Sequence, residues 1–339
     1  MRKIGARDMC LMVVFSFLIF SMGFDCQAAE KPITFKFSHQ FPPKHHLALA
    51  ANLFAKVVAE KSHGSIKVQL FPAGQIYKET EIVDAVGSQS VEMGNSLMER
   101  WGGYDERFDV FGSNKYLILG SDSAWKVVDG RAGEYLSTLM AEKKGCRPIF
   151  WSCSGIYKGI TNSRRPLIRP EDWKGLLLRV ASAPTGQMVT LFGGSPVLMN
   201  SSEAYDAMQR KTVDGSIAAL SSFYERKWYE VQKYLTVFMD SPAYQVWIVN
   251  LKWWNGLPGE KRDIIRQAAL TAQAWDRKEL DKIEAEDIKK LQKLITTHIQ
   301  NEAEMEEWRN ACKPIGDGWL KTTGAEGNKL LGLVLESTK

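Results

Sequence analysis

An arginine interrupts an apolar run in the middle of the sequence. Residues 176–180 read Leu-Leu-Leu-Arg-Val, a composition typical of a strand that is covered on both faces. Burying a guanidinium without a partner is costly, so Arg179 must pair with an acidic side chain, reach solvent at the strand end, or face an anionic ligand. From this pattern alone, a structural ion pair and a binding role remain equally open.

Three histidines form a second group that could carry chemistry. His39, His45 and His46 are close together and could suggest a metal site, but no further His-rich or Cys-rich motif accompanies them. A loop near a pocket mouth is the simpler interpretation. The sequence also lacks a Gly-x-Ser-x-Gly elbow, a Cys-x-x-Cys pair, a Walker loop and a Rossmann fingerprint. We therefore expect no catalytic residues, no metal and no cofactor.

The elements that must position these residues alternate between strands and helices. Apolar residues alternate over 33–37, recur at helical spacing over 47–61, and alternate again over 66–70 before a Pro-Ala-Gly turn. A helix around 79–86, an extended piece near Met93 and a strand over 146–153 continue the order, and a second unit starts near Lys174. This order predicts an α/β fold with largely parallel sheets.

A long helical run follows in the C-terminal third. It starts at Leu257-Pro258 and continues to about Leu294, with no proline or glycine after Gly259. About 35 helical residues would measure about 50 Å, which exceeds one small domain. The alternative is two helices broken near Asp281.

The N-terminus and the composition indicate an exported globular protein. Basic residues precede an apolar run over 11–20, and Ala28-Ala29 closes a predicted signal peptide, residues 1–29, cleaved near Ala29. The apolar run is shorter than the roughly 20 residues of a spanning helix. The chain has 339 residues, 45% of them hydrophobic and 24% charged, which suits two compact domains or one large one.

The net charge and the cysteine content limit which partners and which disulfides the mature protein can have. Removing the signal peptide takes away three basic and two acidic residues, which leaves a net charge of +4 without a dense basic cluster. This argues against nucleic acid and suits a small organic anion. Cys146, Cys153 and Cys312 remain, and an odd number cannot all pair within one chain. Cys146 and Cys153 are too far apart on one extended segment to pair, so no disulfide framework is expected.

Several short motifs occur in an order and spacing that resemble one known family. They are Phe71-Pro72-Ala73-Gly74-Gln75, Thr161-Asn162-Ser163 with Arg165-Pro166, Glu171-Asp172-Trp173-Lys174-Gly175 leading to Leu178-Arg179-Val180, Tyr205 through Val213-Asp214-Gly215, and Tyr229-Glu230-Val231-Gln232-Lys233-Tyr234. Each is weak alone. Taken together, these motifs show that the sequence resembles the solute-binding proteins of tripartite ATP-independent periplasmic (TRAP) transporters, the DctP family, over nearly the whole mature chain.

The resemblance implies a non-catalytic, monomeric periplasmic receptor that delivers a small organic acid to the small and large integral membrane subunits of a transporter. The implied α/β fold is a two-lobe, periplasmic-binding-protein-like fold with hinge strands and a long helix spanning both lobes. Lobe I would comprise 30–155 and about 244–283, and lobe II 156–243 and about 284–310, with 311–339 packing on the lobes. A sensor that binds the same acid and signals to a kinase would have the same pocket, and gene neighbourhood would separate the two.

The resemblance also implies which residues bind the ligand. Arg179 occupies the position of the family arginine that forks onto a ligand carboxylate, which a planar guanidinium matches with two parallel hydrogen bonds. A sulfonate is the alternative, because it also offers several oxygens. Lys158 stands where relatives often carry a second arginine, so it would supply charge without the fork.

The remaining pocket candidates concern the rest of the ligand. Residues 216–219 read Ser-Ile-Ala-Ala where many relatives have a Gln-Glu-Asn-Pro type sequence, so Ala218 lacks the polar asparagine contact. A buried hydroxyl without a partner costs about 1–3 kcal/mol, which disfavours highly hydroxylated sugar acids and favours an aromatic or short acid. Further cleft-lining candidates are Gln40, Ser96, Asn200 and Ser201, and the weaker aromatic ones are Trp151 and Phe223.

Overall fold

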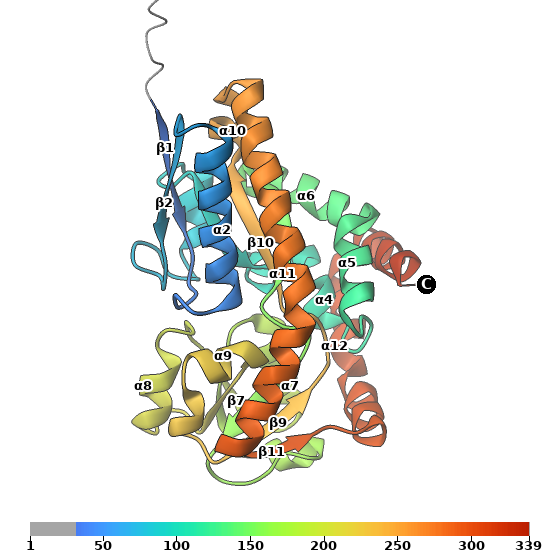
Figure 1. Cartoon of the computed structure of the whole chain (residues 1–339). Coiled ribbons are helices and arrows are strands. Elements are labelled where there is room, and N and C mark those ends of the chain that lie inside the picture. The colour runs from blue at the N-terminus through green and yellow to red at the C-terminus, as the bar shows by residue number, and fades with distance from the viewer. Residues whose placement is uncertain (1–31, 339) are drawn as a thin grey trace, which may run out of the picture.

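The computed structural model describes residues 32–338 and contains two β-sheets that are flanked by helices (Figure 1). The predicted signal peptide, with its cleavage site near Ala29, lies outside the described residues. Within 32–338, no helix has the length and apolarity needed to cross a membrane.

The first lobe is built on a five-stranded sheet with the order β2-β1-β3-β10-β4. Its strands are β1 (Ile33–Ser38), β2 (Ile66–Phe71), β3 (Met93–Leu97), β4 (Cys146–Cys153) and β10 (Tyr244–Asn250). The helices in this part of the chain are α2 (His46–Lys61), α3 (Ile82–Gly87), α4 (Val110–Ser113), α5 (Ser121–Asp129), α6 (Arg131–Lys144) and α10 (Leu251–Gly256). The alternation in 33–37 and the helical spacing in 47–61 are thus confirmed, with Phe35, Phe37 and Phe54 buried in one core.

The second lobe is built on a six-stranded sheet with the order β11-β9-β5-β8-β6-β7. Its strands are β5 (Lys158–Asn162), β6 (Leu177–Val180), β7 (Ser195–Leu198), β8 (Gly215–Ala219), β9 (Tyr234–Phe238) and β11 (Thr296–Ile299). Helices α7 (Ala183–Leu191), α8 (Ala204–Gln209) and α9 (Leu220–Glu225) connect them. The Ser182 hydroxyl accepts a hydrogen bond from the Thr185 amide and so caps α7.

Both sheets are largely parallel, as the alternating sequence pattern predicted, but each contains one antiparallel strand, which the pattern did not predict. β1 pairs in parallel with β2 and β3, but β10 is antiparallel to both β3 and β4. In the second lobe β5 is antiparallel to both β8 and β9. The exceptions, β5 and β10, are the strands by which the chain enters a lobe from the other lobe, so no βαβ crossover sets their direction.

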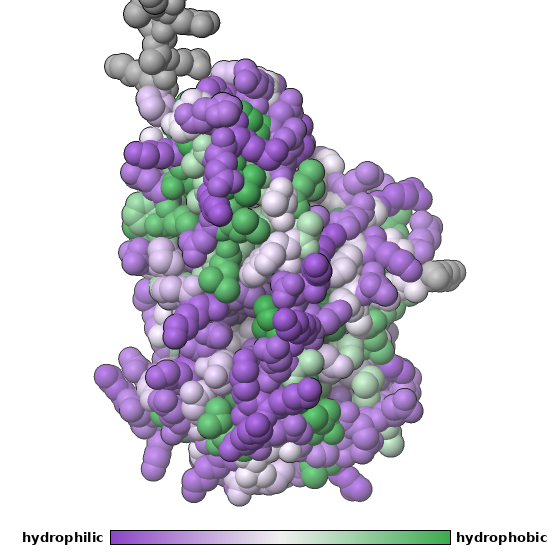
Figure 2. Space-filling model, in the orientation of Figure 1, coloured by the Kyte–Doolittle hydropathy of each residue, from purple (hydrophilic) through white to green (hydrophobic). Residues whose placement is uncertain are grey.

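Helix α11 (Gly259–Leu294) runs across both lobes without a break, which confirms the single long helix and excludes an interruption near Asp281 (Figure 1). It packs on α2 and β4 of the first lobe and on α9 and β11 of the second. Hydrophilic side chains predominate along its outward face (Figure 2). Its inner face buries three acidic side chains, Asp276, Glu284 and Asp287.

The C-terminal helix α12 (Glu302–Ser337) also contacts both lobes. It packs on α4, α5 and α6 and on α7. The Asn301 side chain and Glu304 form a reciprocal capping box at its start. Gly324 has a non-helical backbone with φ of 57°, which lets the helix bend.

The three described cysteines are free and buried. Cys146 and Cys153 are the first and last residues of β4, which agrees with the prediction that they do not pair. Burial raises the pKa of Cys146 and of Cys312 to about 12, so both thiols stay protonated at neutral pH.

Candidate functional site

A cavity of about 50 Å³ lies between the two lobes. Both lobes supply its lining residues. In the first lobe they come from the loops after β1 and β2, from the end of β3 and the segment after it, and from β10. In the second lobe they come from β5, β6, β8, α7, α9 and the segments after β6, β7 and α9. Others lie in the two crossing segments, 154–157 and 239–243, in which the chain passes between the sheets. Its charged lining residues are Glu79, Glu99, Lys158, Arg179 and Arg226, and the others include Gln40, Phe41, Thr185, Ser201, Ile217, Ala218, Ser222 and Gln245.

Arg179 is fully buried and is held by backbone carbonyls of the strands beside it. β6 lies between β8 and β7, so the side chain reaches Met199 after β7 and Ile217 in β8. Nε and Nη2 donate to the Met199 carbonyl at 3.0 and 2.8 Å, and Nη1 donates to the Ile217 carbonyl at 3.3 Å. These bonds fix the plane of the guanidinium, and Nη2 also donates to Ser201 Oγ at 3.1 Å.

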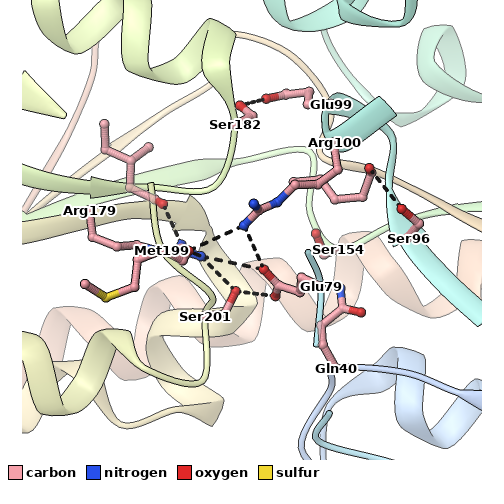
Figure 3. Close-up of polar contacts among 12 residues, drawn as sticks. Gln40, Glu79, Ser96, Glu99, Arg100, Ser154, Arg179, Ser182, Met199 and Ser201 are labelled. Atoms are coloured by element: carbon pink, nitrogen blue, oxygen red, sulfur yellow. Dashed lines mark hydrogen bonds and ion pairs between the residues drawn. The ribbon is translucent and has the colours of Figure 1, made fainter. Parts of the chain in front are cut away.

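Glu79 is the carboxylate beside Arg179. Its Oε2 lies 3.8 Å from Arg179 Nη2 and 3.4 Å from Arg100 Nη2, and its Oε1 accepts a hydrogen bond from the Ser201 hydroxyl (Figure 3). Burial opposes ionisation of Glu79, but the charges of Arg179, Arg100 and Arg226 outweigh it and lower its pKa below the ordinary value. Glu79 is therefore a carboxylate at neutral pH.

Arg226, after α9, adds another guanidinium to this end of the cavity. Its Nη2 donates to the Gln40 carbonyl at 3.0 Å, which joins the second lobe to the loop after β1. Burial lowers the pKa of Arg226, and burial lowers the pKa of Arg179 to about 10, with the charges of Arg100 and Arg226 acting in the same direction on Arg179. Both remain cations at neutral pH.

Lys158 sits at the start of β5 in a different set of charges. Its Nζ lies 3.1 Å from Asp240 Oδ1 and 3.4 Å from Glu99 Oε1, and donates to Ser241 Oγ at 2.8 Å. Asp240 also pairs with Lys115 at 2.7 Å. Burial disfavours the charged form of Lys158, but Asp240 and Glu99 outweigh it and raise the pKa above its ordinary value.

Glu99 lies at the N-terminus of α7. Its Oε2 accepts a hydrogen bond from the Ser182 hydroxyl (Figure 3). It also accepts one of 3.4 Å from the Thr185 hydroxyl. Burial opposes ionisation, but Lys158, Lys115 and the Ser182 hydrogen bond lower the pKa of Glu99 overall. A carboxylate belonging to the protein thus occupies the favourable end of this helix dipole.

Five of the nine predicted ligand-binding residues line the cavity, namely Arg179, Lys158, Gln40, Ser201 and Ala218. Ser96, Asn200, Trp151 and Phe223 are buried but are not among its lining residues. Ser96 donates to the Leu97 carbonyl, Trp151 packs on Tyr244, and Phe223 packs on Trp228. The ligand roles of all nine residues remain predictions.

Sequence reasoning missed Glu79, Glu99 and Arg226. Each lies in or beside a polar segment in which charged residues are common, so no local pattern separates them from solvated residues. The available signal was proximity to a motif, because Glu79 follows the Phe71–Gln75 segment by four residues.

All three histidines are buried, and His45 and His46 connect the start of α2 to α9 and α11. His46 Nδ1 lies 2.6 Å from Asp276 Oδ1 of α11, and His45 Nε2 lies 3.0 Å from Ser221 Oγ of α9. His39 stacks beside Phe41, with ring centroids 6.1 Å apart. In residues 32–338, no group of three or more His, Cys, Asp or Glu side chains is arranged to hold a metal ion.

Beside these histidines, α11 also contacts the segment between the two sheets. Glu284 Oε1 accepts a hydrogen bond of 3.0 Å from the Tyr157 amide, in the segment where the chain crosses from β4 to β5. Burial raises the pKa of Glu284 to about 7. The buried acidic face of α11, formed by Asp276, Glu284 and Asp287, therefore lies where this helix contacts α2, the segment between β4 and β5, and α9.

Comparison with known families matches residues 37–322 to the bacterial extracellular solute-binding protein family 7, DctP. The C4-dicarboxylate-binding periplasmic protein DctP of Rhodobacter capsulatus is 27% identical over 310 residues, which cover 90% of this chain and 92% of that protein. The C4-dicarboxylate-binding protein DctB of Bacillus subtilis is 25% identical over 294 residues, covering 86% of this chain and 83% of the relative.

Solved structures share the fold over almost the entire described chain. The sugar acid binding protein DctPAm of Advenella mimigardefordensis, in complex with galactonate, has a TM-score of 0.84 and 26% identity, and covers 91% of this chain and 99% of its own. A TRAP periplasmic solute-binding protein of Sulfurospirillum deleyianum with bound succinate has a TM-score of 0.83 and 25% identity, with coverage of 90% and 99%.

Proposed function

Since the chain belongs to the bacterial extracellular solute-binding protein family 7, a family of substrate-binding proteins rather than enzymes, we propose that it is a monomeric periplasmic receptor that captures a small organic acid. It delivers this acid to the small and large integral membrane subunits of a TRAP transporter, without a cofactor and without binding nucleic acid. Export by the signal peptide, with cleavage near Ala29, belongs to the same proposal.

One observation carries the proposal. Arg179 is fully buried at a cavity between two lobes, and its nearest carboxylate, Glu79, is shared with Arg100 and Arg226. The Met199 and Ile217 carbonyls hold the guanidinium plane of Arg179 in place beside the cavity, so its orientation is set before an anion binds. Arg179 therefore anchors the ligand carboxylate, and Lys158, Gln40, Ser201 and Ala218 surround the rest of the ligand.

The proposed lobe boundaries follow the course of the chain. Lobe I comprises 30–155 and about 244–283, and lobe II comprises 156–243 and about 284–310. In support, the chain leaves the first sheet after Cys153 and enters the second at Lys158, and it returns between Phe238 and Tyr244. Residues 311–339 form the C-terminal segment that packs on the lobes, and the contacts of α12 (Glu302–Ser337) with both lobes support this. The two crossing segments and α11 then form the hinge.

A thermal-shift screen of carboxylates and sulfonates on the mature protein tests the function. A ligand at 100 times its Kd stabilises the folded state by about 2.7 kcal/mol, and it should be recovered unchanged after prolonged incubation. Stabilisation by a carboxylic acid supports the proposed function. Stabilisation by sulfonates alone would mean that the ligand is a sulfonate rather than a carboxylate. A screen in which no acid stabilises the protein, or an incubation that yields a product, would contradict the proposal.

A further inference from the structure

The charges around the cavity are divided unevenly between its two ends. The arginine end comprises Arg179, Arg226, Arg100 and Glu79, so three cations face one buried carboxylate. The partly exposed Glu203 also acts on Arg179, but it is paired with Lys78. The lysine end comprises Lys158, Lys115, Glu99 and Asp240, so two cations face two carboxylates. Ligand charge is therefore favoured at one end and not at the other.

The arginine end has both excess positive charge and unused donors. Among the described residues, the buried Nε atoms of Arg100 and Arg226 have no hydrogen-bond partner. The lowered pKa of Arg179 and Arg226 reflects their burial and, for Arg179, the repulsion by the other two guanidiniums. Of these two arginines, Arg226 lines the cavity, so a ligand carboxylate here would supply the missing counter-charge and accept from Arg226.

The lysine end is already neutral and is tightly connected. Glu99 Oε1 lies 3.4 Å from Lys158 Nζ, and Asp240 lies 3.1 Å from Lys158 and 2.7 Å from Lys115. Lys158 has a raised pKa because these carboxylates outweigh its burial, so its charge is satisfied within the protein. A second ligand carboxylate at this end would face Glu99, which as a carboxylate only accepts hydrogen bonds.

From this asymmetry we infer that Glu99 makes the receptor selective for compact monocarboxylates with an uncharged, hydrogen-bonding tail, and excludes dicarboxylates of the same length. The ligand carboxylate binds at the arginine end. Its tail reaches the lysine end, where a hydroxyl donates to Glu99, since the three donors of Lys158 already face Glu99, Asp240 and Ser241. An ammonium group in the tail would meet Lys158 and is disfavoured. This specificity rests on the proposed function and adds a substrate class to it.

The matched probes are 4-hydroxybutyrate and succinate, which have the same four-carbon chain and differ at one end. They are the central pair of a calorimetric panel, at pH 7, of neutral-tailed three- to six-carbon monocarboxylates and the dicarboxylates of the same length. We expect the tightest monocarboxylate to bind the wild-type protein at least 10-fold more tightly than its dicarboxylate counterpart. The Glu99→Gln variant should shift this ratio toward the dicarboxylate by at least 10-fold, because the amide keeps the shape and removes the charge. The exposed Glu307→Gln serves as the control and should leave the ratio unchanged.

Each result separates this inference from the function on which it rests. Dicarboxylates that bind the wild-type protein as tightly as their monocarboxylate counterparts overturn the selectivity and leave the acid receptor standing. A ratio that Glu99→Gln leaves unchanged removes Glu99 as its cause. A panel in which no acid binds contradicts the proposed function itself. If Glu99→Gln fails to fold, as shown by its melting curve, the wild-type ratio still decides the selectivity.

Discussion

Replacing Arg179 by alanine should greatly weaken ligand binding while a lysine at this position should restore it only in part. Arg179 is fully buried and presents a guanidinium whose plane is fixed by the Met199 and Ile217 carbonyls. Truncating one partner of a buried, hydrogen-bonded charge pair costs about 2–5 kcal/mol, which corresponds to a loss of roughly 30-fold to several thousand-fold in affinity. A lysine keeps the charge but donates from a single point and loses the fork.

The same substitution also affects folding, which the experiment must separate from binding. Arg179→Ala leaves the Met199 and Ile217 carbonyls without their donor, and a buried unsatisfied group costs about 1–3 kcal/mol. Melting curves of each variant without ligand measure this loss, and calorimetry below the melting range measures affinity. Arg164→Ala removes an arginine that is paired with Asp214 and largely exposed, so it is the matched control and should bind normally.

An unchanged affinity in a folded Arg179→Ala variant would refute the reasoning, because it would remove Arg179 from the site. Equal losses in the alanine and lysine variants would show that geometry matters more than charge. Equal losses in Arg179→Ala and Arg164→Ala would mean that net charge, and not the cavity, attracts the ligand.

Three further predictions concern the lysine end, the hinge and closure. Lys158→Arg should keep measurable binding and Lys158→Glu should abolish it, since a third acid would then face Glu99 and Asp240; calorimetry that gives equal affinities would contradict this. Glu284 binds its proton more tightly in the folded state, because burial raises its pKa from 4.5 to about 7. The free energy of unfolding of the wild type, relative to that of Glu284→Gln, should therefore fall by on the order of 3 kcal/mol as pH rises from about 4.5 to about 7. Urea titrations in which both proteins show the same pH dependence would disprove this. Ligand binding should favour the closed arrangement of the lobes and decrease the radius of gyration in small-angle scattering; an identical profile at saturation would argue against a hinge.

Local periodicity predicted most of the strands and helices, because burial on one face leaves a signal within a few residues. The strand at Ile33–Ser38 and the uninterrupted helix through Asp281 are examples. The direction of β5 and β10 was not predicted, since it depends on how the chain crosses between lobes. Nothing within either strand carries that information.

The candidate site was predictable only where a residue departed from its local pattern. Arg179 drew notice because a charge interrupts an apolar strand. Glu99 did not, although it contacts Lys158 and Ser182, which are 59 and 83 residues away in the chain. For Arg179, the sequence left open a structural ion pair and a role in binding an anionic ligand, and the choice between them depends on the tertiary structure. Its answer depends on how many guanidiniums share Glu79.

The position of β10 in the first sheet has a consequence for how the protein is made. β10 lies between β3 and β4, so β4 has no sheet neighbour until Tyr244–Asn250 has been synthesised. The whole second lobe up to β9 precedes that segment in the chain. The five-stranded sheet of the N-terminal lobe therefore cannot be completed first. Five of the six strands of the second sheet, β5 to β9, lie in one continuous stretch, 158–238, and only the edge strand β11 is added later, so this part of the chain has the earlier opportunity to fold. A nascent chain shorter than about 250 residues leaves the edge of β3 unpaired. Because an unpaired edge can pair with other chains, we expect export and folding factors to bind the chain until β10 has been synthesised.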